Sequence, residues 1–458
     1  MSKKIVVLLF IFIGLIQSCN TTEPPPPGEK ITLTLILEDV SSIEAWIKLT
    51  TNNLQLPTTI TLKQSATGGN SVTQDIVLSY ADTVIYIDSL LPNTTYSFLA
   101  AIQPSNHTNE VKSNVLTVTT MDTTSHNFTW QTWTFGEHSS SVLYDVAIIN
   151  EDCIWAVGEI YLNDSLGNPD PNAYNAVHWD GTEWIPFRIM FYTICGQQNR
   201  TPYPASSIFA FSESDIWVGM LGSQVARLNG TTQVATYCLP VSVRKLWGVD
   251  NQNIYAVGVN GQIARYNGRV WTRIESGTDA DLSDVWGTPD GNEIWACGWS
   301  NQSGRVAILK IKGNGVESIW DSQTNTTLNI YRGTLLNSLW ANGNGEFIFV
   351  GGQVLRHSLI DKRIVRLEWI RYPNRSKVLE LGNYGYRIKG SNKNNIAVAG
   401  DAAMIWHYNG TSWHKYSELH SENDRLYGLA VNNDFIVAVG KRFEAGVLGG
   451  ALLIIGRR

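Results

Sequence analysis

The sequence predicts an all-β protein in which a β-sandwich is followed by a seven-bladed β-propeller. Three observations lead to this fold class. After residue 122, a unit of about 40 residues with four short apolar runs recurs. The runs are rich in branched and aromatic residues, and Gly and Asn separate them, which is typical of strands and turns. Before residue 122, apolar and polar residues alternate with the two-residue period of half-buried strands.

The clearest unit covers residues 246–271, LWGVDNQNIYAVGVNGQIARYNGRVW. Its four runs predict a four-stranded antiparallel meander. Asn267-Gly268 marks a tight hairpin, because both residues tolerate the positive φ of a two-residue turn. A single meander cannot bury both of its faces, so it needs neighbours of its own kind.

Those neighbours are present in the sequence. Residues 262–268 (QIARYNG) match residues 224–230 (QVARLNG) at a spacing of 38 without a gap, and similar units make seven in all between residues 154 and 458. Four-stranded units of this length are typical of propeller blades. The last unit ends one strand short. Residues 128–135 (FTWQTWTF) resemble an outer strand, so we expect them to complete the seventh blade and close the ring.

The N-terminal residues indicate export. Lys3 and Lys4 precede a short apolar run, which is typical of a secretory signal and too short for a permanent transmembrane helix. Residues 1–19 resemble a bacterial lipoprotein signal, which implies cleavage before Cys19 and its lipidation, and hence a lipid-anchored protein of the cell envelope, at the outer membrane or cell surface of a Gram-negative bacterium. An ordinary signal peptide with an incidental Cys is the alternative. Residues 20–29 (NTTEPPPPGE) form a Pro-rich, stiff tether.

Residues 30–121 predict a β-sandwich. Runs such as ITLTLIL, VIYI and YSFLAAI occur at regular spacing with polar breaks between them. Residues 90–96 (LLPNTTY) resemble the L-x-P-x-T-x-Y segment of fibronectin type III domains, and Trp46 stands where these domains have an early core Trp. The resemblance implies a spacer or docking module without catalytic chemistry. It also implies that Tyr96 is a structural corner residue.

Aromatic residues recur at fixed positions in the propeller segment, residues 122–458. Sixteen of the 17 Trp residues lie between Trp130 and Trp413. A repeated aromatic column could serve sugar stacking, but these positions fall inside strands, so we interpret them as packing between blades. Trp286→Ala should then lower the free energy of unfolding by ~3–5 kcal/mol. The two columns are Phe209, Trp247, Trp286 and Trp340, and Trp155, Trp217, Tyr255 and Trp295.

The turns carry a further repeated pattern. Residues 179–184 (WDGTEW), 266–271 (YNGRVW) and 408–413 (YNGTSW) resemble the Asp-box turns of sialidase-like propellers, although the leading Ser or Thr and the usual spacing are missing. Asp boxes are structural turns and imply no activity. More broadly, the units resemble those of tandem-repeat propeller lipoproteins without known catalytic apparatus.

Charge and cysteine content narrow the function classes. Without Lys3 and Lys4 the chain has 32 basic and 40 acidic residues, a balance that argues against nucleic acid as a partner. No cysteine pair has metal-ligand spacing, so we expect neither metal nor cofactor. Cys297 takes a repeat position that predicts a buried thiol. Cys195 and Cys238 could form a disulfide in an oxidising compartment, which the sequence leaves open.

The distribution of loop lengths predicts the binding face. In a four-stranded up-and-down blade, the turns between the first two strands and between the last two strands share one face, and these turns are short throughout. All long inserts fall on the opposite face, as expected for a binding surface on a rigid scaffold. Their aromatic and Arg side chains suit a glycan or a protein. The candidate ligand-binding residues are Tyr161, Arg200, Tyr203, Trp299, Arg305, Arg371, Tyr372, Arg375 and Tyr384.

The predicted function is therefore a membrane-anchored, non-catalytic binding or scaffold lipoprotein that recognises a glycan or an envelope or extracellular protein. No H-E-x-x-H, G-x-S-x-G, C-x-x-C or P-loop pattern is present. Glycosidase carboxylate pairs leave no local pattern, so enzymatic activity stays open. The alternatives are a sialidase-like glycoside hydrolase, which requires Arg and carboxylate side chains around the central channel, and an envelope assembly factor.

Overall fold

The computed structural model describes residues 30–104, 109–324, 335–341, 346–357, 364–366, 368–372, 375–378, 380–443 and 449–458, and gives only the backbone of the strands between 364 and 378. The chain forms two compact units. One comprises Ile47–Ile85, Tyr96–Val118 and the described residues up to Ile36; the other comprises Leu37–Trp46, Tyr86–Thr95 and Thr119–Arg458. The fold is all-β, and no helix among the described residues is long and apolar enough to cross a membrane.

The first eight strands form two antiparallel sheets, in the orders β1-β2-β5 and β4-β3-β6-β7, with β8 pairing with β6. The predicted alternation is visible in β6, where every second side chain is buried. Trp46, Phe98 and Tyr96 are buried, and Tyr96 stacks on Phe98 with ring centroids 6.3 Å apart. The strands are β1 (Thr32–Val40), β2 (Ala45–Asn52), β3 (Thr58–Ala66), β4 (Ser71–Leu78), β5 (Asp82–Ile87), β6 (Thr95–Ile102), β7 (Val111–Lys112) and β8 (Leu116–Thr119).

The second unit is built from four-stranded antiparallel sheets, and the described residues form seven of them. In six, four consecutive strands follow one another, as the repeat predicts. These are β10 (Val142–Asn150), β11 (Cys153–Ile160), β12 (Tyr174–Trp179) and β13 (Trp184–Phe187); β16 (Ala205–Ser212), β17 (Asp215–Met220), β18 (Gln224–Asn229) and β19 (Thr232–Cys238); β20 (Lys245–Asp250), β21 (Asn253–Val257), β22 (Ile263–Tyr266) and β23 (Trp271–Ile274); β24 (Asp281–Gly287), β25 (Ile294–Trp299), β26 (Val306–Lys312) and β27 (Gly315–Asp321); β28 (Leu336–Ala341), β29 (Phe347–Gly351), β30 (Val354–His357) and β31 (Ile364–Arg366); and β34 (Gly385–Asn392), β35 (Asn395–Gly400), β36 (Ile405–Tyr408) and β37 (Trp413–Lys415).

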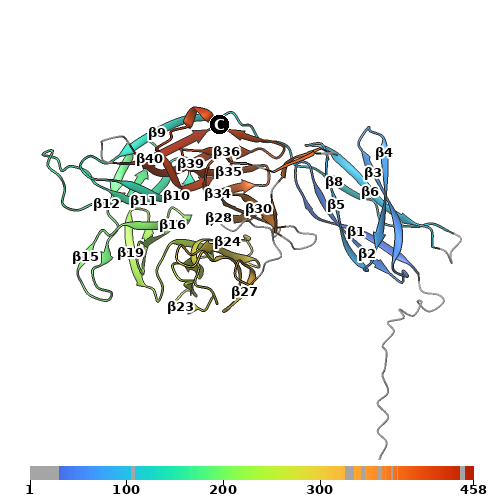
Figure 1. The fold of residues 1–458 in the computed structure, drawn as a ribbon, viewed down its shortest axis with the longest axis horizontal. Coiled ribbons are helices and arrows are strands. Elements are labelled where there is room, and N and C mark those ends of the chain that lie inside the picture. The colour runs from blue at the N-terminus through green and yellow to red at the C-terminus, as the bar shows by residue number, and fades with distance from the viewer. Residues whose placement is uncertain are drawn as a thin grey trace, which may run out of the picture. The chain divides into compact units, whose positions relative to one another are not determined.

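The seventh sheet joins residues from both ends of this unit. Its strands are β38 (Arg425–Val431), β39 (Phe435–Arg442), β40 (Gly450–Arg457) and β9 (Thr129–Phe135), which pairs antiparallel with β40 (Figure 1). The first strand of each sheet packs beside the first strand of the next, and β38 packs beside β10. The first strands therefore surround a common axis. Two short hairpins lie outside these sheets, β14 (Phe191–Tyr192) with β15 (Arg200–Thr201) and β32 (Glu368–Tyr372) with β33 (Arg375–Val378).

A polar contact recurs within the aromatic core of the sheets. In the second sheet, Trp217 of β17 lies opposite Arg227 of β18. Both donate to Asp215 Oδ1, the indole Nε1 at 2.8 Å and the guanidinium Nε at 2.7 Å. In the fourth sheet, Trp295 and Lys310 donate to Glu293 in the same way. A buried donor is costly when unpaired, and these acceptors satisfy the indole nitrogens of Trp217 and Trp295.

The residues of the two predicted aromatic columns are not all buried to the same extent. Trp155, Trp217, Tyr255 and Trp295 are all at most 3% exposed. Trp286 packs against three core clusters but is only half-buried, and Lys389 Nζ lies 4.3 Å from its ring centroid. We therefore expect Trp286→Ala to cost no more than the lower end of the predicted range, about 3 kcal/mol, in urea unfolding. A loss at the upper end would contradict the partial exposure of this ring.

Two histidines attach the segment before β9 to the sixth sheet. His126 Nδ1 and His407 Nδ1 lie 2.8 Å apart. His407 Nε2 lies 2.9 Å from the Asn395 side-chain oxygen, so Nε2 carries the proton and Nδ1 accepts. His126 Nδ1 is then the donor, and its Nε2 lies 3.1 Å from the Ser412 hydroxyl. Both rings are neutral at pH 7, because burial lowers the pKa of each.

The histidine pair predicts acid sensitivity. Burial lowers the pKa of His126 from 6.5 to about 4 and that of His407 to about 3. Between pH 6.5 and about 4 the unfolded chain binds more protons than the folded one, so stability is present above pH 6.5 and falls as the pH decreases through this window. We expect the Tm to fall in this range, and the double variant His126→Gln/His407→Gln to show a shallower fall. Parallel curves for the two proteins would contradict the prediction.

Candidate functional site

A β-bulge recurs in the first strand of six of the seven sheets, close to the face that carries the long loops. In β10, Leu143 pairs with Gly158 and Asp145 pairs with Val157, so Tyr144 is left outside the ladder. A bulge re-aims its side chain and is frequent beside functional sites. The register shifts leave out the same position in the other strands. The residues at these positions are Tyr144, Ser206, Ser283, Asn337, Tyr386 and Tyr427.

Three neighbouring sheets place tyrosines at the bulge. The ring centroids of Tyr144 and Tyr427 are 6.4 Å apart, and those of Tyr386 and Tyr427 are 5.5 Å apart. Tyr384 continues the group at 6.3 Å from Tyr386. These four residues, the tyrosine cluster, are all half-buried and so expose part of each ring. They lie where the first strands of the first, sixth and seventh sheets begin.

Charged side chains border the tyrosine cluster. Arg425 Nε lies 3.4 Å from Asp401 Oδ1. Burial, together with the negative charge of Asp401 and a hydrogen bond to it, raises the pKa of Tyr386 to about 12. The Tyr161 hydroxyl donates to Glu159, and this hydrogen bond, aided by burial, raises the pKa of Tyr161 to about 12. The phenols are therefore neutral hydrogen-bonding groups at neutral pH.

The third, fourth and fifth sheets present polar groups at this same end of the first strands. Asn337 donates to the Gly385 carbonyl and accepts from the Trp299 indole at 3.1 Å. Arg244 pairs with Asp281 at 3.0 Å. Aromatic rings and polar groups thus occur together at the start of the first strands, an arrangement that suits a ligand with both apolar faces and hydroxyl groups.

Buried charged and hydroxyl side chains of the first strands lie further along these strands. Lys245 donates to both oxygens of Asp145, at 2.6 and 2.7 Å, and Ser207 donates to Asp145 from the sheet between them. Three sheets further on, Lys389 donates to Asp284 at 2.8 Å and Ser338 donates to the same carboxylate. These six residues, the inner ring, are buried.

Both charges of an inner-ring pair persist at neutral pH. Burial opposes ionisation of Asp284, yet the positive charge of Lys389 and Arg387 holds its pKa below the ordinary value. Burial lowers the pKa of Lys389 to about 8, although Asp284 counteracts it. The two groups are therefore a structural ion pair at pH 7.

The candidate residues chosen from the sequence occupy separate places. Tyr384 belongs to the tyrosine cluster, and Tyr161 lies on the long-loop face with its hydroxyl on Glu159. Arg305 is held by Asp279 at 3.0 Å and Asp321 at 2.6 Å. Tyr203 packs against a core cluster. The backbones of Arg371, Tyr372 and Arg375 lie in β32 and β33, whose side chains are outside the description, as is the whole of Cys19.

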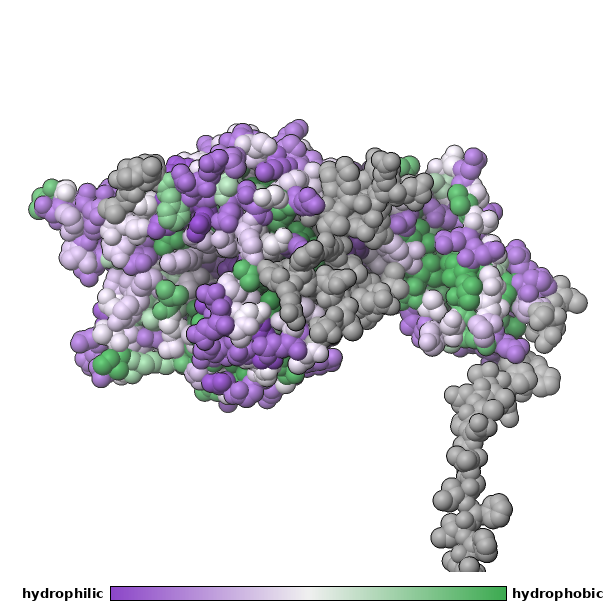
Figure 2. Space-filling model, in the orientation of Figure 1, coloured by the Kyte–Doolittle hydropathy of each residue, from purple (hydrophilic) through white to green (hydrophobic). Residues whose placement is uncertain are grey.

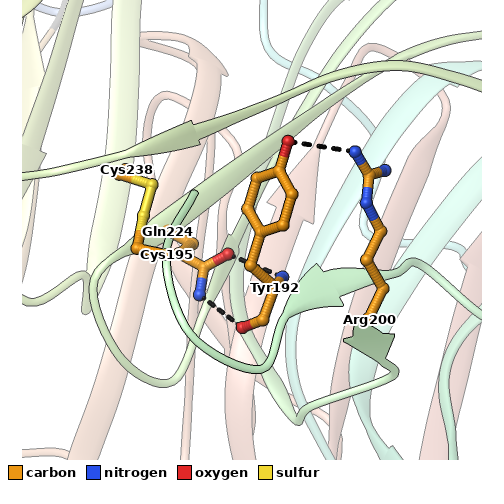
Figure 3. The surroundings of a disulfide bond; sticks show 5 residues. All are labelled: Tyr192, Cys195, Arg200, Gln224 and Cys238. Atoms are coloured by element: carbon orange, nitrogen blue, oxygen red, sulfur yellow. Dashed lines mark hydrogen bonds between the residues drawn. A yellow bond between two sulfur atoms is a disulfide. The ribbon is translucent and has the colours of Figure 1, made fainter. Parts of the chain in front are cut away.

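Arg200 lies on a braced hairpin of its own. Cys195, between β14 and β15, forms a disulfide with Cys238 at the end of β19, with Cα atoms 6.1 Å apart (Figure 3). The Gln224 side chain exchanges two hydrogen bonds with the backbone of Tyr192, at 2.8 and 2.9 Å. Arg200 lies over the Tyr192 ring and donates to its hydroxyl at 3.1 Å. A disulfide here is typical of proteins outside the reducing cytosol. Cys297 is buried, as predicted.

Three of the four tyrosines in this candidate site were not predicted from the sequence. Tyr144, Tyr386 and Tyr427 lie inside strands, where they read as core positions. A signal that could have found them is the polar or aromatic residue that interrupts the alternation shortly after each first strand begins. Among the described residues, no group of three or more His, Cys, Asp or Glu side chains is placed to hold a metal ion.

Comparison with known proteins gives a likeness of fold. No family model and no curated protein matches the chain. Among solved structures, the chain resembles PorZ of Porphyromonas gingivalis, a surface component of the type-IX secretion system (TM-score 0.47, 11% identity), over 92% of this chain and 62% of that one. It thus spans less than two thirds of the length of PorZ. It also resembles BamB from Moraxella catarrhalis (TM-score 0.35, 10% identity, 69% and 100% covered) and a quinoprotein alcohol dehydrogenase-like protein from Bacteroides thetaiotaomicron (TM-score 0.38, 11% identity, 84% and 95% covered).

Proposed function

We propose that this protein is an exported lipoprotein in which a seven-bladed β-propeller binds a glycan at the tyrosine cluster. A fibronectin type III-like module at residues 30–121 serves as spacer, and an acylated Cys19 anchors the chain to the cell envelope. The seven consecutive sheets and the closing pair β9–β40 support the propeller. The lipoprotein-like signal and the disulfide Cys195–Cys238 support an extracytoplasmic location.

The tyrosine cluster is the observation that carries the choice of ligand. Sugar rings present apolar C–H faces and a rim of hydroxyls, so they suit partly exposed aromatic rings with carboxylate, guanidinium and amide groups nearby. Here Asp401, Arg425 and Asn337 supply those polar groups. On the face drawn in Figure 2, exposed apolar residues of the second unit are scattered among hydrophilic ones, which fits a polar ligand better than a broad apolar protein interface.

A glycan array followed by calorimetry tests the proposal. The full chain carrying Cys19→Ser is screened first, and the best glycan is then titrated into Tyr386→Ala and Tyr427→Ala. We expect each change to weaken binding at least tenfold, about 1.4 kcal/mol. Tyr80→Ala, which removes a ring that is 75% exposed on the other unit, is the matched control. Absence of glycan binding, with capture of a single envelope protein through the same tyrosines, would favour the protein-partner or assembly-factor alternative.

The anchor has an independent test. We expect the wild-type chain to incorporate labelled fatty acid and to partition into detergent, and Cys19→Ser to do neither. Equal labelling of both would show that Cys19 is not the acylated residue.

A sialidase-like hydrolase is the second candidate, and the contact of Tyr161 with Glu159 favours it, because sialidases use a Tyr nucleophile. The raised pKa of Tyr161 and the salt bridge of Arg425 with Asp401 argue against it, since the phenol is hard to ionise and the carboxylate is already paired. We expect no release of fluorophore from aryl sialosides. Turnover that disappears in Tyr161→Phe would establish the enzyme instead.

A further inference from the structure

A second polar cavity lies on the opposite face, the one formed by the short turns. It is an open depression with a volume of about 360 Å³ and is lined by residues of the second and third sheets. No carboxylate is among its lining residues, whereas two arginines are. A cavity of this kind favours a negatively charged group. It is lined by Arg227, Asn251, Gln252, Tyr266, Asn267, Gly268 and Arg269.

Arg227 is held in place before any ligand arrives. Its Nε donates to Asp215 at 2.7 Å, and its guanidinium carbon lies 5.2 Å from the centroid of the Trp217 ring. Asp215 raises the pKa of Arg227 further, so the group is permanently charged. Arg269 lies exposed at the rim of the cavity. A fixed guanidinium loses little conformational freedom on binding, which favours planar recognition of a carboxylate.

The same repeat position is already occupied elsewhere in this unit. Arg356 of β30 lies opposite Ile348 of β29, just as Arg227 lies opposite Trp217. Its Nε pairs with Glu346, the counterpart of Asp215. Its two terminal nitrogens donate to the two oxygens of Glu44, each at 3.1 Å. Glu44 comes from the segment Leu37–Trp46, which belongs to this same unit.

The surroundings of the two arginines also correspond. Arg356 lies 5.4 Å from the ring centroid of Trp46, two residues after Glu44. Ser42 lies against Gly410, and Gly410 is the turn glycine equivalent to Gly268 of the open cavity. The occupied position therefore shows which chemistry this site accepts, namely a carboxylate on a short loop that also carries an aromatic residue.

We infer that the cavity at Arg227 binds an acidic side chain on a loop of a partner protein, in the manner in which Arg356 holds Glu44. The partner carboxylate accepts from the terminal nitrogens of Arg227, Arg269 adds positive charge at the rim, and the amides of Asn251 and Gln252 complete the polar lining. This surface is separate from the tyrosine cluster, so the protein has two docking faces, one for each proposed ligand.

Peptide binding to the full chain tests this inference. The probe is a fluorescent peptide with the sequence of residues 42–46, SIEAW, and its control is SIQAW, which lacks the carboxylate. We expect SIEAW to bind at least fivefold more tightly than SIQAW, and salt to weaken the difference. Asn251→Asp/Gln252→Glu adds two carboxylates to exposed turn positions and should abolish binding without altering the Tm. Arg273→Ala, an exposed arginine on the third sheet, should bind as the wild type does.

The controls separate the competing outcomes. Binding that persists in Asn251→Asp/Gln252→Glu but is lost in Arg356→Ala would place the peptide at the occupied position and overturn the inference. Equal affinity for SIEAW and SIQAW would exclude carboxylate recognition. Glucuronate binding at this cavity, without peptide binding, would make it a site for acidic sugars and also overturn the proposal. None of these results affects glycan binding at Tyr386 and Tyr427.

Discussion

Asp284→Ala is expected to lower the free energy of unfolding by about 3–5 kcal/mol, because it leaves Lys389 charged and unpaired in the interior. Asp284 is 0% exposed and accepts from Lys389, from the Ser338 hydroxyl and from the backbone N–H of Leu339. Removing the carboxylate therefore orphans donors from two neighbouring sheets. Urea unfolding followed by Trp fluorescence measures the loss.

A double variant separates the lost pair from the lost packing. We expect Asp284→Leu/Lys389→Met to recover most of the stability, because replacing both charges by apolar groups leaves no unpaired ion. Removing the exposed pair Arg273–Glu275 should change stability by less than about 1 kcal/mol. Should Asp284→Ala be as mild as this surface change, the inner ring would not hold the sheets together.

Gly298→Ala is expected to cost at least about 3 kcal/mol, at or above the upper end of typical overpacking. A Cβ at Gly298 of β25 would lie 2.0 Å from the Asp281 carbonyl oxygen and 2.7 Å from Leu282 Cα. Both are backbone atoms of β24, so no side-chain rotation relieves the clash. The strand pair must separate at the bulge that sets the side chain of Ser283. Thermal unfolding measures the loss.

Gly315→Ala is the matched control. Gly315 lies on β27 of the same sheet, has no positive φ, and a Cβ there would meet its nearest atom at 3.7 Å. We expect its Tm to stay within a few degrees of the wild type, or to rise slightly from reduced freedom of the unfolded chain. Similar losses in both variants would show that close approach at Gly298 is not the cause.

Much of the fold could be predicted from local patterns in the sequence. The 38-residue spacing between QVARLNG and QIARYNG places β18 and β22 at equivalent positions. A hairpin turn lies at Asn267-Gly268 as predicted, but Tyr266 pairs with Trp271, so its loop has four residues instead of two, and of the predicted pair only Gly268 has a positive φ, +87°. Side-chain alternation and turn preferences involve only a few adjacent residues, so a single sequence is enough to predict them. The aromatic columns could also be predicted from the sequence. The partial exposure of Trp286 could not, because it depends on how neighbouring sheets pack against each other.

Only part of the candidate site could be predicted from the sequence. Loop length singled out Tyr384, which the structure places beside Tyr386, but the rest of the tyrosine cluster depends on bulges that shift Tyr144, Tyr386 and Tyr427 out of the ladder. A bulge adds one residue to one strand, and its position becomes certain only when the partner strand is known. The cavity at Arg227 was not predicted for a related reason, since residues of two different sheets line it.

The sequence alone determined that the chain is all-β, that its units repeat, and which segments carry the hairpin turns, because strand and turn preferences are properties of adjacent residues. Only the tertiary structure decided that Cys195 meets Cys238, that Lys389 neutralises Asp284 across 105 residues, and that Arg227 and Arg356 share one environment. Such contacts join residues far apart in the chain. Their chemistry therefore exists only after the sheets have packed.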